Sequence, residues 1–198
     1  MIIVLAGTPG TGKTSLAKML SERYNLRYLS LTEFVLEKGI WIDYDAQRRS
    51  FVIDPEGVVV EIRREIRKVY RGVVIETHDL ELLWEAGIEP LRVFVLRCRP
   101  DVLYNRLLRR GWPFSKVLEN IEAELTGVLA WQAKVYFPRV ACEIDTTLAG
   151  VNATVERIAR NIENIEKDNT ICQSIDWVSD EDVVKFVINL SLKHSMGY

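Results

Sequence analysis

The sequence predicts an α/β fold of three layers, in which a five-stranded parallel sheet lies between two layers of helices. Short apolar runs with the length of buried strands alternate along the chain with longer segments whose apolar residues have helical spacing. This alternation favours a parallel sheet, because each helix that connects two parallel strands covers one face of it. The 198 residues are 48% hydrophobic and 27% charged, which suits one domain with a full core.

The five predicted strands are the apolar runs at residues 2–6, 27–31, 72–77, 91–96 and 140–145. A first helix is expected from Ser15, and the later ones cover residues 33–38, 55–70, 79–86, 102–110, 115–136, 151–167 and 183–190. Thr32, Asp54 and Ser115 are candidate N-caps, and Gly39 is expected to end the second helix. Residues 40–49 show no clean period and are predicted to form a loop.

A glycine-rich motif follows the first strand directly. Residues 7–14 read Gly-Thr-Pro-Gly-Thr-Gly-Lys-Thr, the pattern G-x-x-x-x-G-K-T, and a helical segment follows. Glycines allow successive N–H groups to point into one concavity, and the helix adds its unpaired amides and dipole. Lys13 would place a charge on the outer phosphates, and the Thr14 hydroxyl can coordinate Mg²⁺. The motif predicts a nucleoside triphosphate site, and the flanking strand and helix argue against a chance match.

Composition and charge exclude several classes of protein. The formal net charge of −2 argues against a nucleic-acid coat or a membrane surface, so direct nucleic-acid binding is not expected. Cys98, Cys142 and Cys172 lack metal or redox spacing and are expected to be reduced. No segment reaches the roughly 18 consecutive apolar residues of a membrane span, and the first strand leaves no room for a signal peptide. A cytoplasmic protein is therefore expected.

Two candidate site residues follow the third predicted strand. Ligands of open parallel sheets bind beyond the carboxyl ends of the strands, where Glu76 and His78 would lie. A carboxylate at the end of an apolar strand is costly, so Glu76 is expected to hold Mg²⁺ together with Thr14. A partner for a helix N-terminus is the alternative for Glu76. His78 either has a structural role or orients a water molecule or the γ-phosphate.

Arginines gather before a predicted helix break. Arg106, Arg109 and Arg110 precede Gly111-Trp112-Pro113. Phosphoryl transfer develops charge on the transferring oxygens, and guanidinium groups on a mobile lid can neutralise it while water is excluded. Arg106 and Arg110 are one helical turn apart and share a face. A solvated basic helix end is the alternative interpretation.

The end of the chain has a different character. Residues 168–174 are polar and predict a connector, and Ser179-Asp180-Glu181-Asp182 has the character of a capping box. An amphipathic stripe from Val183 to Leu190 follows. We therefore divide the chain into a domain at 1–167 and an extension at 168–198. The terminal helix either docks on the protein's own core or binds a partner.

Together these features resemble the adenylate kinase isoenzyme six group, small archaeal and eukaryotic proteins that are similar to nucleoside monophosphate kinases. The likeness runs from Met1 to about Lys167. It rests on residues 7–14, the 28–54 region with its Asp43-Tyr44-Asp45, the 74–78 turn, the 102–112 segment and the 119–124 stretch. The phosphate loop alone is widespread, but its combination with an acid-x-His turn and an Arg-Gly-aromatic lid is more specific.

The resemblance implies an adenylate-kinase-like fold of the P-loop NTPases, with a nucleoside-monophosphate-binding (NMP-binding) segment around 30–53 and a short lid around 108–118. It implies binding of ATP and Mg²⁺, transfer of the γ-phosphoryl group to AMP or a related monophosphate, and ATPase activity. Glu76 and His78 would be the acid and the histidine of the family, and Arg106 and Arg110 would act from the lid. The residues implied to bind the nucleotide are Gly10, Thr11, Gly12, Lys13, Thr14, Ser15 and Arg110.

The resemblance also implies a partner, a platform protein of the small ribosomal subunit, and a role in maturation of the 16S rRNA precursor on the pre-30S particle. The net charge of −2 suits recognition of a basic ribosomal protein better than direct RNA binding. Two functions therefore stay open. One is an adenylate or broad-specificity nucleoside monophosphate kinase. The other is an ATP-switched assembly factor with little kinase activity.

Two positions depart from the pattern of that group. Its acid is usually aspartate, and Glu76 is one methylene longer. Val35 stands where some relatives have an arginine that could grip the acceptor phosphate, and Arg48 and Arg49 are the candidates to replace it.

Overall fold

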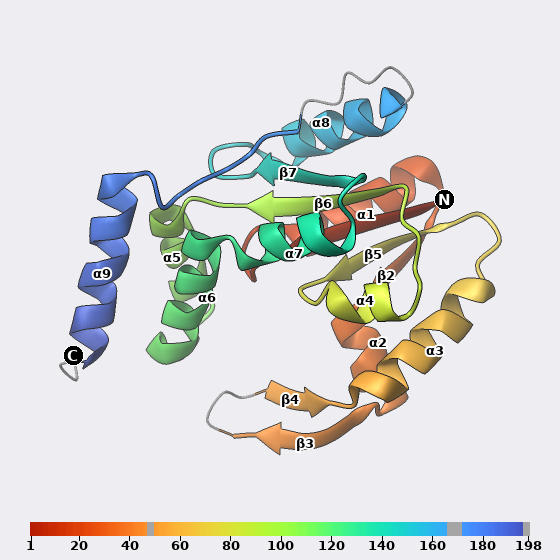
Figure 1. Ribbon diagram of the computed structural model, residues 1–198, viewed down its shortest axis with the longest axis horizontal. Helices are drawn as coiled ribbons and strands as arrows, with labels where there is room; N and C mark the ends of the chain where they lie inside the picture. Colours follow the sequence, from red (N-terminus) through yellow and green to blue (C-terminus); the bar gives the residue numbers. More distant parts are fainter. Residues whose placement is uncertain (47–49, 166–171, 196–198) are drawn as a thin grey trace.

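A computed structural model describes residues 1–46, 50–165 and 172–195 (Figure 1). Its central sheet consists of β1 (Ile2–Gly7), β2 (Arg27–Ser30), β5 (Val73–Thr77), β6 (Arg92–Arg97) and β7 (Ala141–Asp145). The strand order is β2-β5-β1-β6-β7, and every neighbouring pair is parallel. The predicted five-stranded parallel sheet is confirmed.

Helices cover both faces of this sheet. On one face lie α1 (Lys13–Tyr24) and α8 (Val151–Glu163). On the other lie α2 (Leu31–Lys38), α3 (Pro55–Arg67), α4 (Glu81–Glu85) and α7 (Val128–Tyr136). Ile3 and Leu5 of β1 pack under the first layer, and Val4 and Ala6 pack under the second. Because β1 is buried on both faces, its sequence is a continuous apolar run instead of an alternating one.

Three further helices pack together beyond the carboxyl end of β6. They are α5 (Pro100–Leu108), α6 (Phe114–Thr126) and α9 (Glu181–Ser195). Leu103 of α5, Ile121 of α6, and Val187 and Leu190 of α9 share one apolar cluster. In Figure 1 the terminal helix α9 lies beside α5 and α6. Of the two alternatives for the terminal stripe, docking on the protein's own core is therefore confirmed.

The loop predicted at residues 40–49 is wrong, because part of it forms a hairpin. The hairpin pairs β3 (Trp41–Asp45) with β4 (Ser50–Ile53) in antiparallel register. Its side chains are largely exposed on both faces, so the sequence shows no apolar period. Aromatic contacts hold it together: the Phe51 ring lies 5.0 Å from Trp41 and 5.1 Å from Tyr44, between ring centroids.

The single helix predicted at 115–136 is also wrong, since α6 and α7 are separate helices joined at Gly127. This residue adopts the left-handed conformation, with φ of 66°. A Cβ atom there would lie 3.1 Å from the Arg97 guanidinium, so a glycine satisfies both the turn and the close approach. The sequence signal was the glycine itself, which the helical spacing on both sides obscured.

Two predicted N-caps lie elsewhere. The N-cap of α2 is Ser30 and not Thr32; the Ser30 hydroxyl accepts a hydrogen bond from the Glu33 amide at 3.4 Å. Helix α6 begins after Pro113, before the predicted cap Ser115. The prediction that Gly39 ends α2 is confirmed, with Gly39 at a φ of 66°.

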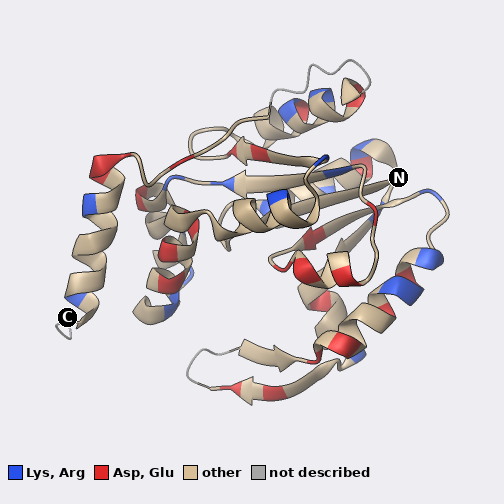
Figure 2. Ribbon diagram, viewed as in Figure 1, with Lys and Arg blue, Asp and Glu red and all other residues tan. Residues whose placement is uncertain are grey.

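Most charged residues are exposed or half-buried, and Figure 2 shows where they occur along the ribbon, many of them on the helices. Arg63, Arg64, Arg67 and Lys68 of the α3 region are exposed, as the amphipathic pattern predicted. Within the described ranges, no helix is both long enough and apolar enough to cross a membrane.

The prediction that all three cysteines are reduced is wrong. Cys142 on β7 and Cys172 form a disulfide, and only Cys98 is free. The two cysteines are 30 residues apart, a spacing that carries no signal in the sequence. They meet because the chain returns along the sheet edge, where Gln173 pairs with Glu143 of β7.

We expect one titratable thiol, that of Cys98, in protein purified without reductant and unfolded in denaturant. Reduction should lower the free energy of unfolding by roughly 3 kcal/mol, because the bond closes a long loop of the unfolded chain. Thiol titration and denaturant unfolding with and without reductant measure both quantities. In the matched control Cys172→Ser, whose substituted side chain is exposed, reductant should have no effect. Three titratable thiols in the unreduced protein would contradict the bond.

Candidate functional site

The glycine-rich motif forms a turn between β1 and α1, as the sequence predicted. Gly10 and Gly12 have φ of 93° and 98°, values that favour glycine. A Cβ atom at Gly10 would also meet the Leu103 side chain at 2.8 Å. The Thr11 hydroxyl donates to the Thr8 carbonyl at 2.8 Å and tightens the turn. The backbone of the loop therefore has the conformation and the freedom from side chains that a phosphate cradle requires.

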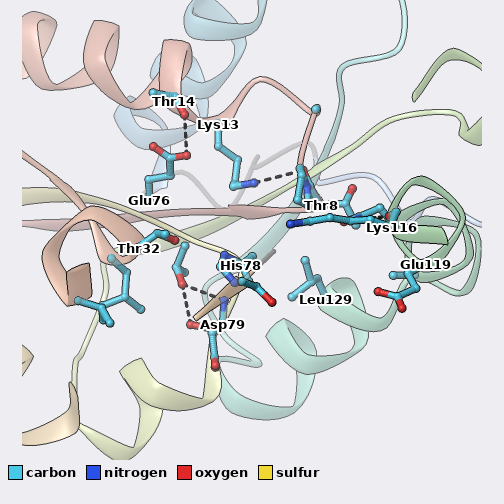
Figure 3. Close-up of a pocket in the computed structure, with 18 of the residues that line it drawn as sticks. Thr8, Lys13, Thr14, Thr32, Glu76, His78, Asp79, Lys116, Glu119 and Leu129 are labelled. Atoms are coloured by element: carbon cyan, nitrogen blue, oxygen red, sulfur yellow. Dashed lines mark hydrogen bonds between the residues drawn. The ribbon is translucent and has the colours of Figure 1, made fainter. Parts of the chain in front are cut away.

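Lys13 is the buried cation of this loop. Its Nζ donates to the carbonyl oxygens of Gly7 at 2.8 Å and Thr8 at 3.2 Å (Figure 3). Burial lowers the pKa of Lys13 to about 8; the nearby Glu76 opposes this shift and Arg110 adds to it. The ammonium is thus held next to the loop by neutral carbonyls, and an anion bound there would provide the missing counter-charge.

Glu76 and Thr14 are brought together. The Thr14 hydroxyl donates to Oε1 of Glu76 at 2.7 Å, and the Tyr28 hydroxyl donates to Oε2 at 2.7 Å. The hydroxyl and carboxylate oxygens are the donors that Mg²⁺ prefers, and Mg²⁺ commonly takes only one or two protein ligands beside substrate phosphates. Within the described ranges there is no cluster of three or more His, Cys, Asp or Glu that could hold a metal alone. The residues present therefore fit Mg²⁺ that arrives with a nucleotide.

His78 follows β5 at the edge of the same site. The side chain of His78 is exposed at the cavity, where partial loss of hydration and then the positive charge of Lys13 lower the pKa of His78. The preceding turn is fixed by Thr77, whose hydroxyl accepts from the Asp79 amide and donates to the Asp79 carbonyl, both at 2.8 Å. Figure 3 shows His78 and Asp79 on the side of the cavity opposite Thr14.

These side chains line one cavity of about 870 Å³. This volume lies within the range of small-molecule sites. The phosphate loop and β5 form one wall, and α6, α7 and the NMP-binding segment form the others. The titratable residues that line it are Lys13, Glu76, His78, Asp79, Arg110, Lys116 and Glu119. The cavity thus joins the predicted ATP residues to the segment predicted to bind an acceptor.

The predicted lid contains the short connection between α5 and α6. Gly111 turns the chain with a φ of 66°. The Trp112 ring has two cations near it, Arg110 with its Cζ atom at 5.5 Å and Lys116 with its Nζ atom at 4.7 Å from the ring centroid. Because all three line the cavity, the lid presents an aromatic ring and two positive charges to it.

Arg106 does not point where Arg110 points, and the prediction that the two share a helix face is wrong, because α5 ends at Leu108 and Arg110 lies in the turn beyond it. The Arg106 guanidinium donates to the carbonyl oxygens of Gly10 at 3.4 Å, Thr146 at 2.9 Å and Thr147 at 3.0 Å. Arg106 therefore ties the phosphate loop to the turn after β7 and does not line the cavity. Arg110 is the lid arginine that lines it.

The segment predicted to bind a monophosphate, residues 30–53, presents mainly apolar side chains to the cavity. Its lining residues are Leu31, Thr32, Val35, Leu36, Ser50, Phe51 and Ile53. Val35 lines this wall and supplies no charge that could bind an acceptor phosphate. Arg48 and Arg49, the candidates for that role, lie outside the described residues. From the part of this segment that the structure describes, no Lys or Arg lines the cavity.

The sequence analysis missed Tyr28 and Thr8. Tyr28 reaches Glu76 because β2 pairs with β5, with Ser30 opposite Glu76. The Thr8 hydroxyl donates at 2.6 Å to Glu124 of α6, which is distant in the sequence. Strand pairing and helix packing decide both contacts, and neither leaves a local signal.

Comparisons with known proteins agree with this geometry. A family model described as "AAA domain" matches residues 3–127. The chain is 40% identical over 190 residues to the "Putative adenylate kinase" of Saccharolobus solfataricus, an alignment that covers 96% of this chain and 94% of that protein. The protein of the same name from Sulfurisphaera tokodaii is 36% identical, in an alignment that covers 96% of this chain and 93% of that protein. The one from Methanocaldococcus jannaschii is 34% identical, and the alignment covers 89% of this chain and 93% of that protein. The resemblance and the phosphate-loop fold predicted from the motifs are confirmed.

The lowered pKa of Lys13 predicts how affinity for Mg·ATP depends on pH. A lysine with its pKa near 8 is charged at pH 7 and mostly neutral at pH 9, so the dissociation constant should rise roughly tenfold between these values. Isothermal titration calorimetry across that range measures it. In Lys13→Arg the guanidinium keeps its charge, so the profile should be flat. A flat profile for the unmodified protein would contradict the expectation.

The Tyr28–Glu76 hydrogen bond predicts a role in the use of Mg²⁺. Tyr28→Phe removes one of the donors that orient the carboxylate, so the Mg²⁺ concentration for half-maximal nucleotide binding should rise about tenfold. Titration of Mg²⁺ at fixed ATP, followed by calorimetry, measures it. Tyr70→Phe is the matched control, because Tyr70 is fully exposed. Equal Mg²⁺ requirements for the two variants would show that Tyr28 does not orient Glu76.

Proposed function

This chain belongs to the family of archaeal proteins named "putative adenylate kinase", which have the phosphate-loop fold. From that membership we propose that it transfers the γ-phosphoryl group of ATP to a nucleoside monophosphate, with AMP as the expected acceptor. The observation that carries the proposal is the single cavity, which extends from the phosphate loop to the NMP-binding segment. A triphosphate site alone would not need the second half of this space.

The phosphate loop would hold the triphosphate. Backbone N–H groups of Gly10 to Ser15 and the start of α1 would cradle the phosphate oxygens, with Lys13 on the outer phosphates. The carbonyls of Gly7 and Thr8 hold the Lys13 ammonium in place before the nucleotide binds. Arg110 would approach the same phosphates from the lid, where Trp112 helps to exclude water.

Thr14 and Glu76 would hold Mg²⁺, which neutralises charge on the β- and γ-phosphates when bound. Tyr28 orients the Glu76 carboxylate from the side opposite Thr14. Because Glu76 accepts a hydrogen bond on each oxygen, its position is defined before the ligand arrives.

Catalysis would then consist of positioning and charge neutralisation. Lys13 and Arg110 stabilise the charge that develops on the transferring oxygens, and no side chain needs to become bonded to phosphorus. The uncharged imidazole of His78 can accept a hydrogen bond from a water molecule or an acceptor hydroxyl at neutral pH. This feature would support the ATPase activity that we also propose.

The second candidate function is an ATP-switched assembly factor that acts on the small ribosomal subunit in the cytoplasm. One observation favours it: in the described part of residues 30–53, no cation faces the cavity to hold an acceptor phosphate. A weak acceptor site would make phosphate release to water the main reaction. The basic platform protein of the small subunit is the partner that this proposal names.

The assay that tests the proposal measures ADP and inorganic phosphate from Mg·ATP with and without each nucleoside monophosphate. We expect AMP to yield two ADP for each ATP consumed, and Lys13→Met to lower this rate by about 100-fold, since it removes the charge on the transferring group.

Lys13→Arg is the matched variant, because it keeps the charge and isolates its geometry. Phosphate release that no monophosphate alters would contradict the kinase and support the assembly factor. Retention of a small-subunit protein from lysate in an ATP-dependent manner would then be expected.

A further inference from the structure

A buried ion cluster lies behind the phosphate loop. Arg97, the last residue of β6, pairs with Glu124 of α6 and with Glu143 of β7, each at 2.8 Å. All three side chains are almost completely buried. Lys134 adds a fourth charge to Glu143 at 2.7 Å. Apolar side chains of the same volume commonly stabilise a protein as much as a buried ion cluster does. We therefore looked for a function of the cluster other than stability.

Glu124 is the member of the cluster that reaches the site. Its Oε1 accepts from the Arg97 Nε at 2.8 Å, from the Cys98 amide at 3.0 Å and from the Trp177 indole Nε1 at 3.2 Å. Its Oε2 accepts from the Thr8 hydroxyl at 2.6 Å. Four donors from three segments of the chain thus hold one carboxylate, which leaves little freedom for its position.

Thr8 directly follows Gly7, the last residue of β1, and is the point from which the phosphate loop starts. Its side chain is anchored to Glu124, whereas its carbonyl accepts from Lys13 Nζ and from the Thr11 hydroxyl. The position of Thr8 therefore decides where the ammonium and the first turn of the loop lie. Only 3% of the Thr8 surface is exposed, so its hydroxyl is held mainly by Glu124 within the protein.

The extension after residue 172 completes the cluster. Gln173 pairs with Glu143, and the Ile175 carbonyl accepts from an Arg97 Nη1 at 3.2 Å. The Trp177 indole then reaches Glu124. A segment outside the predicted nucleotide domain thus contacts the carboxylate that anchors the phosphate loop.

We propose that Glu124 is a positioning residue for the phosphate loop, and that Trp177 of the extension positions Glu124. The inference rests on the proposed function, since it assigns to the loop the task of binding ATP. It gives the extension a role in the nucleotide site, although Trp177 itself does not line the cavity.

The first experiment separates the hydroxyl of Thr8 from its volume. Thr8→Val keeps the shape but removes the donor, whereas Thr8→Ser keeps the donor. We expect the dissociation constant for Mg·ATP to rise about tenfold in Thr8→Val and to stay within about twofold in Thr8→Ser. Equal affinities for the two variants would overturn the role of Glu124.

The second experiment acts from the extension. Trp177→Phe removes the indole donor and keeps an aromatic ring, and we expect the dissociation constant for Mg·ATP to rise about threefold. Trp131→Phe is the matched control, because Trp131 is 62% exposed on α7, and it should bind as the unmodified protein does. The melting temperature of each variant, measured without nucleotide, distinguishes a loss of stability from a loss of positioning. A lower melting temperature with unchanged affinity in Trp177→Phe would overturn the inference.

The double variant tests whether Thr8 and Trp177 act through the same carboxylate. If they do, Thr8→Val with Trp177→Phe should bind less than about twofold more weakly than Thr8→Val alone, whereas independent effects would multiply. Multiplied effects would overturn the link through Glu124. Failure of the unmodified protein to bind Mg·ATP would refute the proposed function, whereas normal binding by the unmodified protein and by all these variants would refute only this inference.

Discussion

The burial of one ammonium group beside a glycine-rich turn is the constraint on which the site depends. Lys13 is buried, and its hydrogen-bond partners are two backbone carbonyls. Those carbonyls belong to Gly7 and Thr8, so the strand β1 that carries them must be held rigidly. Its complete burial between two helical layers supplies that rigidity.

The polar side chains around Lys13 are held in place by hydrogen bonds to one another and to the backbone. Tyr28 and Thr14 hold the two oxygens of Glu76, and Thr77 fixes the turn that carries His78. The two contacts of Glu76 join different strands and helices, and the Thr77 contact fixes its own turn, so the site is ordered without a ligand. The lid is the contrasting part, because Arg110 and Trp112 lie on a short exposed connection.

The parts of the site that are contiguous in the chain could be predicted, and the parts that depend on packing could not. The phosphate loop is a strand, a turn and a helix in direct succession, and Glu76 stands out as a charge at the end of an apolar strand. Trp177 gives no such signal, because it lies 53 residues from Glu124 and its contact depends on how the extension returns. The direction of Arg106 depends likewise on the turn after β7.

The same distinction explains the errors in the fold. The sheet was predictable because its inner strands β1, β5 and β6 are almost completely buried and therefore mostly apolar. The β3–β4 hairpin was not, since its strands face water on both sides and rely on contacts between rings, for example Trp41 with Phe51. The disulfide was not predicted for a third reason. Cys142 and Cys172 become neighbours only because the chain returns along the edge of the sheet.

The bond between Cys142 and Cys172 also has a consequence for Trp177, which follows Cys172 after only a few residues. A covalent anchor on β7 confines the indole to a small volume around Glu124 and so raises its effective concentration there. In a reduced chain the same segment would have to find that place as a long flexible tail, at a greater entropic cost. The oxidation state of one bond at the edge of the sheet is thereby coupled to the occupancy of a hydrogen bond beyond the carboxyl end of β6.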